Sequence, residues 1–197
     1  MIPRSFFERD PVTCAQELIG CELVWGQCAG IIVETEAYAV VNDEACHTFL
    51  RPIVRKFIAD HAAGFAYVYL NYGMYWLLNV LVKGGCTDGF VLIRAIEPTR
   101  GVPLMQKRRG LGQTLGKARK IEALCSGPGK LTIALSVNDR DHGRDLCRVP
   151  QSGFRGAATA VNWRSAPRIG ISRAKGHPWR FLATGNRFVS HYRRVEK

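Results

Sequence analysis

Acidic residues are scarce in this sequence. Its 197 residues contain 16 Asp and Glu against 28 Lys and Arg, which gives a formal net charge of +12 at pH 7. A surface of that sign attracts polyanions, so DNA, RNA or an anionic membrane is the expected partner. The alternative is a basic protein whose charge serves only to keep it in solution.

Paired cysteines are also missing. The seven cysteines are odd in number and scattered, and no Cys-x-x-Cys occurs. This pattern argues against a disulfide framework and against a structural zinc site, and it is typical of reduced thiols in a cytosolic protein. The first ten residues carry no long apolar segment and no small-residue cleavage pattern, so we expect no signal peptide and no secretion.

One uncharged stretch is long enough to raise the question of a membrane span. Residues 61–82 contain no Asp, Glu, Lys or Arg, and about 20 apolar residues suffice to cross a bilayer. Asparagines, glycines and four tyrosines interrupt the stretch, with Tyr67 and Tyr69 at alternate positions. We therefore expect two strands joined by a turn at residues 71–74, and no membrane partner.

The rest of the chain predicts a single domain of mixed secondary structure. Repeats and linkers are absent, and 47% hydrophobic residues suffice for a real core. Helices and strands alternate without a βαβ rhythm, so we expect an α+β fold with helices flanking an antiparallel or mixed sheet. The expected helices are 11–19 (opened by Asp10-Pro11), 102–109, 115–124 and 131–135; the expected strands are 22–25, 29–38, 90–96 (ended by Pro98), 158–162, 167–171, 180–183 and 188–191; residues 48–61 show no clear period, and 193–197 form a frayed tail.

Two carboxylates leave one apolar strand together. Glu34, Glu36 and Tyr38 follow the apolar residues 31–33 at alternate positions, and His47 comes after a short acidic segment. Because side chains alternate along a strand, the first three share one face unless a bulge intervenes. Two carboxylates, a phenol and an imidazole form a candidate active site; the alternative is a set of strand-end and loop residues in solvent.

Arg94 is the expected partner of Glu36. It stands among apolar residues of the predicted strand 90–96, where an arginine is rarely buried without an acidic partner. A Glu/Arg pair around a water molecule can orient and deprotonate it, because a carboxylate with a pKa of about 4.3 is ionised at neutral pH. The alternative places the Arg94 side chain on the solvent face.

Apolar side chains occupy the predicted turn, namely Tyr72, Met74 and Tyr75. On a chain of this charge, an exposed tip of this kind suits a wedge that enters a base stack, at a cost of a few kcal/mol for unstacking. Tyr38 and Tyr69 then sandwich an extruded base. The alternative is an aromatic cluster in the core.

Two further segments are less specific. In residues 126–130, small residues and Lys130 precede a predicted helix and suit a phosphate, but the Walker spacing is missing and a plain turn explains them equally well. A second possibility is a divalent metal site, yet only one histidine is available and the H-E-x-x-H pattern is absent, so we expect no metal and no cofactor. The candidate ligands would be Glu34, Glu36, Asp43, Glu44 and His47.

Six segments in this order resemble the alkyladenine (3-methyladenine, methylpurine) DNA glycosylases. They extend from near Phe6 to near Ser190, almost the whole chain. The segments are VETEAY at 33–38, DEACH at 43–47, YVYLNYGMYWLLN at 67–79, VLIRAIEP at 91–98, CSGPGKL at 125–131 and PRIGI at 167–171.

The resemblance implies a monofunctional, metal-independent enzyme that excises damaged purines from duplex DNA. It also implies a monomer, located on DNA in the cytoplasm or a nucleus, with a compact domain and a protruding β-hairpin. By position, the resemblance implies that Glu36 is the general base and that Arg94 and the carbonyl of Ile169 are water ligands. It implies that Tyr72 is the wedge, that Tyr38, His47 and Tyr69 form the base pocket, and that Asn79 discriminates against the exocyclic amine of guanine. From the hairpin tip and the loop at 126–130 we also expect DNA contacts by Met74, Tyr75, Ser126, Gly127 and Lys130.

The sequence also departs from the family pattern. Family members carry an Arg-Asn pair shortly after the histidine, whereas Arg51 and later Arg55-Lys56 stand here, and Gly84-Gly85 resembles a small insertion. Contacts to the DNA backbone and the range of lesions are therefore the features that the resemblance defines least. Three other classes stay open: a metal-dependent nuclease, a non-catalytic nucleic-acid-binding module, and a glycosylase that uses a lysine as a lyase.

Overall fold

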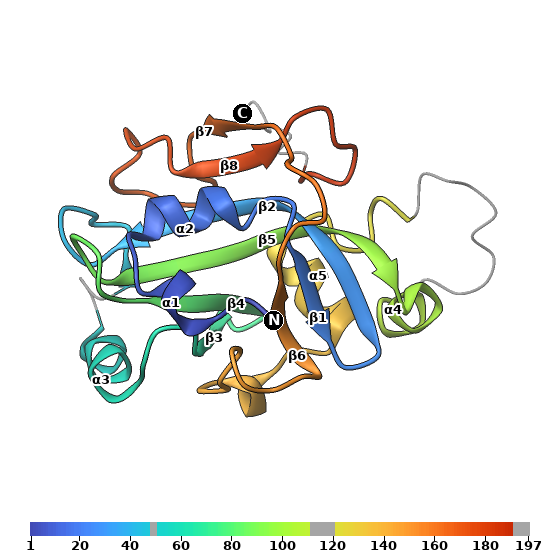
Figure 1. The fold of residues 1–197 in the computed structure, drawn as a ribbon, viewed down its shortest axis with the longest axis horizontal. Coiled ribbons are helices and arrows are strands. Elements are labelled where there is room, and N and C mark those ends of the chain that lie inside the picture. Colours follow the sequence, from blue (N-terminus) through green and yellow to red (C-terminus); the bar gives the residue numbers. More distant parts are fainter. Residues whose placement is uncertain (48–50, 111–120, 191–197) are drawn as a thin grey trace.

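An antiparallel sheet organises the molecule (Figure 1). The structure is a computed structural model that describes residues 1–47, 51–110 and 121–190. Its central strands are β2 (Cys28–Ala39) and β5 (Gly89–Arg100), and the strand order is β3-β4-β5-β2-β1-β6. The other edge of β2 is shared, because β1 pairs with its first residues and β8 with Glu34 to Glu36. The shorter strands are β1 (Glu22–Trp25), β3 (Ala66–Asn71), β4 (Tyr75–Val82), β6 (Ser152–Arg155), β7 (Trp163–Ala166) and β8 (Arg180–Ala183).

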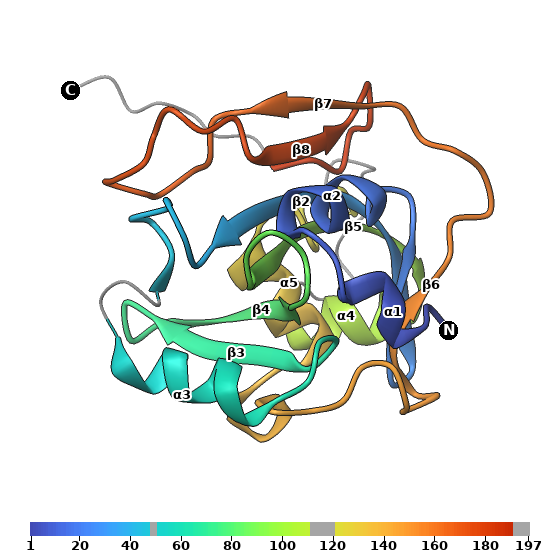
Figure 2. The same ribbon diagram turned by 60° about the vertical axis from the view of Figure 1, so that its left-hand side comes forward.

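Helices pack against this sheet. α2 (Pro11–Glu17) contacts β2 and β5, whereas α5 (Pro128–Leu135) contacts β4 and β5. α3 (Pro52–Asp60) lies beside β3 (Figure 2). The remaining helices are α1 (Arg4–Phe7), α4 (Val102–Arg108) and the 3-10 turn η3 (Asp139–Asp141). The architecture is thus a single compact α+β domain, as the sequence predicts.

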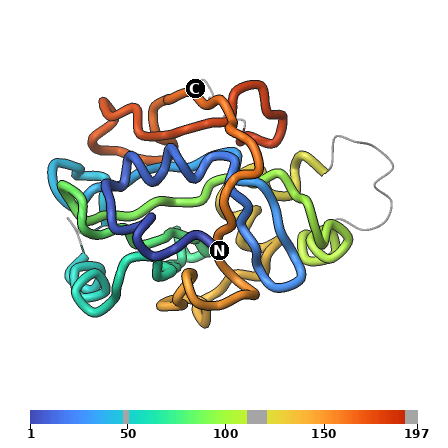
Figure 3. The backbone as a smooth tube through the Cα atoms, in the orientation of Figure 1, coloured from blue at the N-terminus to red at the C-terminus, as the bar shows by residue number. Residues whose placement is uncertain are grey.

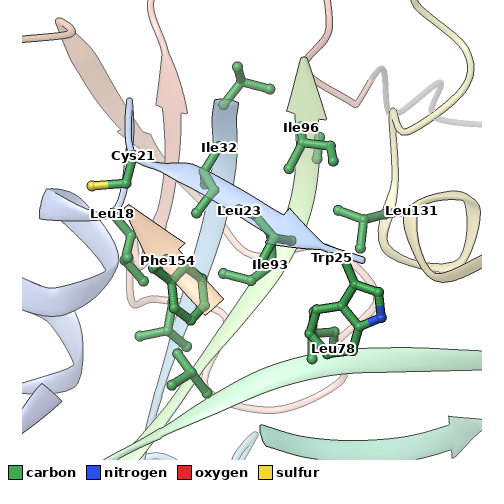
Figure 4. Packing of buried hydrophobic residues seen from close by; sticks show 14 of the residues in the cluster. Leu18, Cys21, Leu23, Trp25, Ile32, Leu78, Ile93, Ile96, Leu131 and Phe154 are labelled. Carbon is green, nitrogen blue, oxygen red and sulfur yellow. The ribbon is translucent and has the colours of Figure 1, made fainter. Parts of the chain in front are cut away.

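The main core draws on elements from the whole length of the chain (Figure 4). Leu18, Leu23, Ile93, Leu131 and Phe154 come from the end of α2, from β1, β5, α5 and β6, and each is at most 1% exposed. Burial of each such side chain stabilises the fold by about 1.5–3 kcal/mol relative to exposure. The first residues run alongside β6, as the chain path in Figure 3 shows, and the core includes both Ile2 and Phe188.

The helix start at Asp10 is confirmed. The Asp10 carboxylate accepts hydrogen bonds from the backbone N–H groups of Val12 (2.8 Å) and Thr13 (3.2 Å), and Pro11 is the first helical residue. These bonds satisfy donors that a helix leaves unpaired at its N-terminus. The two predicted strand pairs are confirmed as well, since β1 pairs with β2 and β3 with β4.

The uncharged stretch at 61–82 is a hairpin, as predicted. Its turn closes with a hydrogen bond from the Met74 N–H to the Asn71 carbonyl (3.0 Å), and both Tyr72 (φ 51°) and Gly73 (φ 68°) have positive φ. Two positive φ angles are the pattern of the turns that β-hairpins prefer, but they are costly for a tyrosine. Among the described residues, no helix is long and apolar enough to cross a bilayer.

The predicted end of a strand at Pro98 is wrong, because β5 continues to Arg100. Pairing with β4 stops at Leu92, while pairing with β2 continues through Pro98 to Arg100. A proline lacks the N–H donor and is tolerated in a strand that has a neighbour on one side only. Beyond Leu92, β5 has β2 as its paired strand and no longer β4, so a proline is tolerated near its end.

A helix occupies part of the stretch that shows no clear period in the sequence. In α3, Val54, Phe57 and Ile58 are buried and pack on Tyr67 and Phe90. Their spacing is that of one helix face, but exposed basic residues between them hide it in a sequence reading. The helix α5 also begins at Pro128, earlier than predicted, so Lys130 belongs to its first turn.

The C-terminal third was predicted least well. Of four expected strands, only 180–183 forms (β8), while β7 lies at 163–166, between two of the expected segments. Residues 158–162, 167–171 and 188–190 have no strand. In the expected helix 115–124, the described residues 121–124 form a turn; residues 111–120, 191 and the predicted frayed tail 193–197 lie outside the described residues.

Candidate active site

The central strands bring Glu34, Glu36 and Arg94 into contact. The Nε of Arg94 donates to Glu34 Oε1 (2.9 Å), and its Nη1 donates to Glu36 Oε2 (3.2 Å). Both carboxylates are fully buried and Arg94 is 6% exposed. The register between β2 and β5 shifts on either side of Glu34, a bulge that re-aims side chains locally. The solvent-facing alternative is therefore wrong for all three residues.

Glu36 receives two further hydrogen bonds. The Tyr38 hydroxyl donates to Glu36 Oε2 (2.8 Å), and the backbone N–H of Ile169 donates to Glu36 Oε1 (2.8 Å). Ile169 thus meets Glu36 through its N–H, and a role for its carbonyl oxygen stays a prediction. Burial lowers the pKa of Arg94, but Glu36 and Glu34 raise it overall, so the guanidinium stays charged.

A cavity of about 610 Å³ lies directly in front of this group. Its volume falls within the range of about 300–1,000 Å³ of small-molecule sites. Glu36 itself is not part of the wall; three residues that donate hydrogen bonds to it are. The lining includes Tyr38, His47, Arg51, Tyr67, Tyr69, Tyr72, Asn79, Phe90, Leu92, Arg94, Pro128 and Ile169. All predicted catalytic and pocket residues other than Glu36 therefore meet in one cavity.

Aromatic rings form its walls. The centres of the His47 and Tyr69 rings are 4.4 Å apart at an interplanar angle of 67°. Burial, and then the charge of Arg51, lowers the pKa of His47 from 6.5 to about 4, so the ring is neutral near neutral pH. Burial and the Glu36 carboxylate raise the pKa of Tyr38 well above its ordinary value, so its hydroxyl keeps the proton it donates. The wall thus offers neutral rings with polar edges.

Asn79 lies in the floor formed by β4. Its side chain is buried, and Nδ2 donates to the Tyr67 carbonyl oxygen (3.2 Å). This bond fixes the amide group in the cavity wall. Because the amide is anchored, its remaining donor and acceptor positions are fixed. It can therefore discriminate between a purine whose polar groups match those positions and one whose groups do not.

The hairpin tip is exposed at the cavity mouth. Tyr72 is 80% exposed, Met74 66% and Tyr75 46%, so the core-cluster alternative is wrong for these side chains. Tyr72 lines the cavity, whereas Met74 and Tyr75 line a smaller hollow beside it. A tyrosine held at positive φ and left exposed is an outlier of the kind that gathers at functional sites.

The segment 126–130 lies next to this tip. Gly129 approaches Tyr75 so closely that a Cβ on Gly129 would lie 2.8 Å from the Tyr75 Cγ. Gly127, with φ 138°, is the N-cap of α5, and Lys130 Nζ lies 3.5 Å from the Ser126 hydroxyl. Ser126, Gly127 and Lys130 are outside the cavity wall, and the structure brings their segment to the hairpin.

Arg168 is a residue of the site that the sequence reading missed. It donates to both Asp43 oxygens (2.7 Å each), and its guanidinium lies 4.7 Å from the centre of the Tyr38 ring. Arg168 belongs to the PRIGI segment and Asp43 to DEACH. The two residues are 125 positions apart, so no local sequence pattern indicates that they pair. Both Asp43 oxygens are thus bonded to Arg168, although Asp43 was one of the candidate metal ligands. In the described part of the chain, no group of three His, Cys, Asp or Glu is arranged to hold a metal ion.

Comparison with known proteins gives a consistent result. The sequence model of a family described as methylpurine-DNA glycosylase (MPG) matches residues 5–187. A protein of Rhodopseudomonas palustris is 42% identical over 96% of this chain and 88% of its own length. One of Agrobacterium fabrum is 41% identical over 96% and 92% of the two chains, and one of Granulibacter bethesdensis 39% over 96% and 87%. All three are named "Putative 3-methyladenine DNA glycosylase".

Proposed function

The chain belongs to the methylpurine-DNA glycosylase family, and from this premise we propose how its cavity removes a damaged purine. The protein is a DNA N-glycosylase: it hydrolyses the bond between a base and its sugar in base excision repair. Its substrate is therefore DNA, and it acts where the DNA is. The proposal concerns the residues that carry out each step.

The observation that carries the proposal is the position of Glu36. A fully buried carboxylate, held by Arg94, Tyr38 and the Ile169 N–H, stands directly behind a cavity with aromatic walls. Burial of a carboxylate costs free energy unless hydrogen bonds or a counter-charge compensate for the lost solvation. A carboxylate in this position is suited to act as a general base on a nucleotide that binds in the cavity.

Entry of the base requires that a nucleotide leave the helix. The basic protein binds duplex DNA through the phosphates, and Tyr72 at the exposed hairpin tip enters the base stack and fills the gap. Tyr75 and Met74 flank it, while Ser126, Gly127 and Lys130 contact the backbone nearby. Unstacking costs least for a damaged or mismatched base, which contributes to selection.

The extruded purine stacks in the cavity. Tyr38 faces one side of the base, and Tyr69 with His47 the other, with the His47 edge available for a polar contact. Stacking on an aromatic ring is worth about 1–3 kcal/mol per base. Asn79, anchored on the Tyr67 carbonyl, excludes the exocyclic amine of guanine.

Hydrolysis then follows an inverting course. Glu36 takes a proton from a water molecule that Arg94 and the Ile169 carbonyl orient, and the water oxygen bonds to C1′ from the face opposite the base. The bond from C1′ to the base nitrogen breaks with oxocarbenium character at the sugar, as in inverting glycoside hydrolysis. Alkylated purines such as 3-methyladenine carry a positive charge and leave readily with the electron pair, and the abasic site remains.

We further propose that one copy of the chain acts alone in the cytoplasm. The residues assigned to the base pocket line one cavity within a single copy of the chain. The chain has the scattered free thiols expected of a reducing compartment. Native mass spectrometry of the protein with and without DNA measures the subunit number directly, and a dimer as the active species would contradict this part.

The test of the whole proposal uses defined lesions. Duplexes that carry an alkylated purine, hypoxanthine or ethenoadenine are incubated with the protein in EDTA and then treated with alkali. We expect the protein to release the free base before alkali is added, and the strand to be cleaved only after alkali. Borohydride should trap no enzyme on the DNA. Cleavage before alkali, a requirement for metal, a trapped adduct, or no release from any lesion would overturn it.

A further inference from the structure

A second buried carboxylate lies beside the site without a part in the chemistry above. Glu34 is fully buried, and it accepts four hydrogen bonds. Its Oε1 takes Arg94 Nε (2.9 Å), Arg180 Nε (2.7 Å) and the Ser190 hydroxyl (2.8 Å), and its Oε2 takes the Ser190 N–H (2.7 Å). Burial raises the pKa of Glu34, but Arg94, Arg180 and Ser190 lower it overall, so the carboxylate is charged.

The contact with Arg94 determines where that guanidinium points. Arg94 offers Nε to Glu34 and Nη1 to Glu36. Because a guanidinium is planar and rigid, fixing one nitrogen fixes the plane of the others. The geometry points to Glu34 as a positioning residue, on the basis of the function proposed above: it orients Arg94 toward Glu36, while Arg180 and Ser190 hold Glu34 itself.

The support for Glu34 comes from the distant end of the described chain. Arg180, on β8, stands opposite Glu36 in the strand register and also donates through Nη2 to the Ser190 carbonyl oxygen (3.4 Å). Ser190 lies 156 residues beyond Glu34 in sequence. Arg180 and Ser190 thus hold the carboxylate without being part of the cavity wall, and they contribute to the active-site geometry without touching the base.

The charges of this group balance. Glu34 and Glu36 supply two negative charges, Arg94 and Arg180 two positive ones. Loss of the Glu34 charge leaves a positive excess in this group, and loss of the Arg180 charge leaves a negative one, so the two changes act on the pH dependence of the site in opposite directions. The other groups that face Glu36 are Tyr38, Tyr69, Arg168 and the Ile169 N–H, and they are unchanged in such variants.

The experiment compares Glu34→Gln, Arg180→Gln and Arg180→Lys with the wild-type protein. Single-turnover base release from a hypoxanthine duplex is followed across pH, and duplex affinity is measured by fluorescence anisotropy. For Glu34→Gln we expect a maximal rate lower by about 10- to 100-fold, by analogy with the loss seen when groups that orient metal ligands are removed. Duplex affinity should be unchanged, and the acid limb of the pH–rate profile should move to lower pH.

Removal of the Arg180 charge should shift the acid limb in the opposite direction. Arg180→Gln should move the acid limb to higher pH, while Arg180→Lys keeps the charge and should leave the limb in place. A merely structural role would lower the active fraction without moving the limb. The matched control is Glu22→Gln, an equal change at an exposed ion pair with Arg155 (3.2 Å), which should leave rate and limb unchanged.

Clear outcomes would overturn the inference. The inference is wrong if Glu34→Gln keeps the wild-type rate and acid limb. It is also wrong if Glu34→Gln and Arg180→Gln move the acid limb in the same direction. If thermal melting shows that Glu34→Gln does not fold, the comparison of Arg180→Gln with Arg180→Lys decides alone. Failure of the proposed function is distinct, because the wild-type protein itself would then release no base.

Discussion

The guanidinium of Arg168 lies 4.7 Å from the centre of the Tyr38 ring and donates 2.7 Å hydrogen bonds to both oxygens of Asp43. Asp43 in turn accepts from the N–H groups of Ala39 (3.1 Å) and Ala45 (3.2 Å). One buried ion pair therefore fixes the end of β2 and the turn that leads to His47. The two sides of the proposed base pocket depend on it.

Arg168→Met should destabilise the protein strongly. The change leaves Asp43 buried without its cationic partner, and breaking such a pair costs about 3–5 kcal/mol. The control is Arg155→Met, which breaks the exposed pair with Glu22 and should cost no more than about 1 kcal/mol. Urea unfolding measures both free energies, and equal losses would show that the Arg168 pair is not specially important.

Glu36→Gln should abolish excision and keep DNA binding. The amide has the same shape but cannot accept a proton from water, and removal of a general base typically costs about 100- to 10,000-fold in rate. Single-turnover release and anisotropy binding to a lesion duplex separate the two properties. Glu97→Gln, at a carboxylate of β5 bonded to Asn186 (2.8 Å), serves as the control. Retained excision by Glu36→Gln would refute the assignment of the base.

Tyr72→Ala should lose activity through base extrusion rather than through chemistry. Without the ring, nothing fills the gap in the stack, so the change in 2-aminopurine fluorescence beside the lesion should weaken. Tyr72→Phe keeps the ring at the exposed tip and should retain the signal. An unchanged signal in the alanine variant would remove the wedge role from this residue.

Gly129→Ala should displace the hairpin tip. The added Cβ would lie 2.8–3.1 Å from atoms of the Tyr75 side chain, closer than carbon atoms pack. We expect weaker binding to lesion duplexes, measured by anisotropy, with little change in the rate of bound complexes. Gly176→Ala is matched, since a Cβ there meets nothing within 4 Å. Equal affinities of the two variants would contradict the contact.

His47 should make the fold less stable in mild acid. Its pKa falls from 6.5 to about 4 in the folded chain, mainly through burial. As the pH drops below 6.5 toward 4, the unfolded state takes up the proton first, so stability declines across this interval. His47→Gln should flatten that decline in urea midpoints measured against pH. His177→Gln, at a histidine outside the cavity wall, should not; a decline unaltered by His47→Gln would disprove the cause.

Local patterns in the sequence were sufficient for several elements and for the pairing of charged residues in the candidate site. Asp10 and Pro11 define a helix start, alternation defines β2 and the hairpin, and the pair of Glu36 with Arg94 follows from a charge placed among apolar residues. These rules act between neighbours only a few residues apart, so they can be read without a fold. The motifs in their order also identify the family.

Tertiary structure alone decided how these parts support one another. The partners Asp43 and Arg168 are 125 residues apart, and Glu34 and Ser190 are 156 apart. The pairing of β8 with Glu34 to Glu36 brings the C-terminal part of the chain to the edge of β2 beside the carboxylates. A buried charge must find its counter-charge wherever the fold supplies one, and no periodicity along the chain encodes that choice. The sequence by itself determined which residues are the candidates for the chemistry, whereas the packing of distant strands decided how they are held.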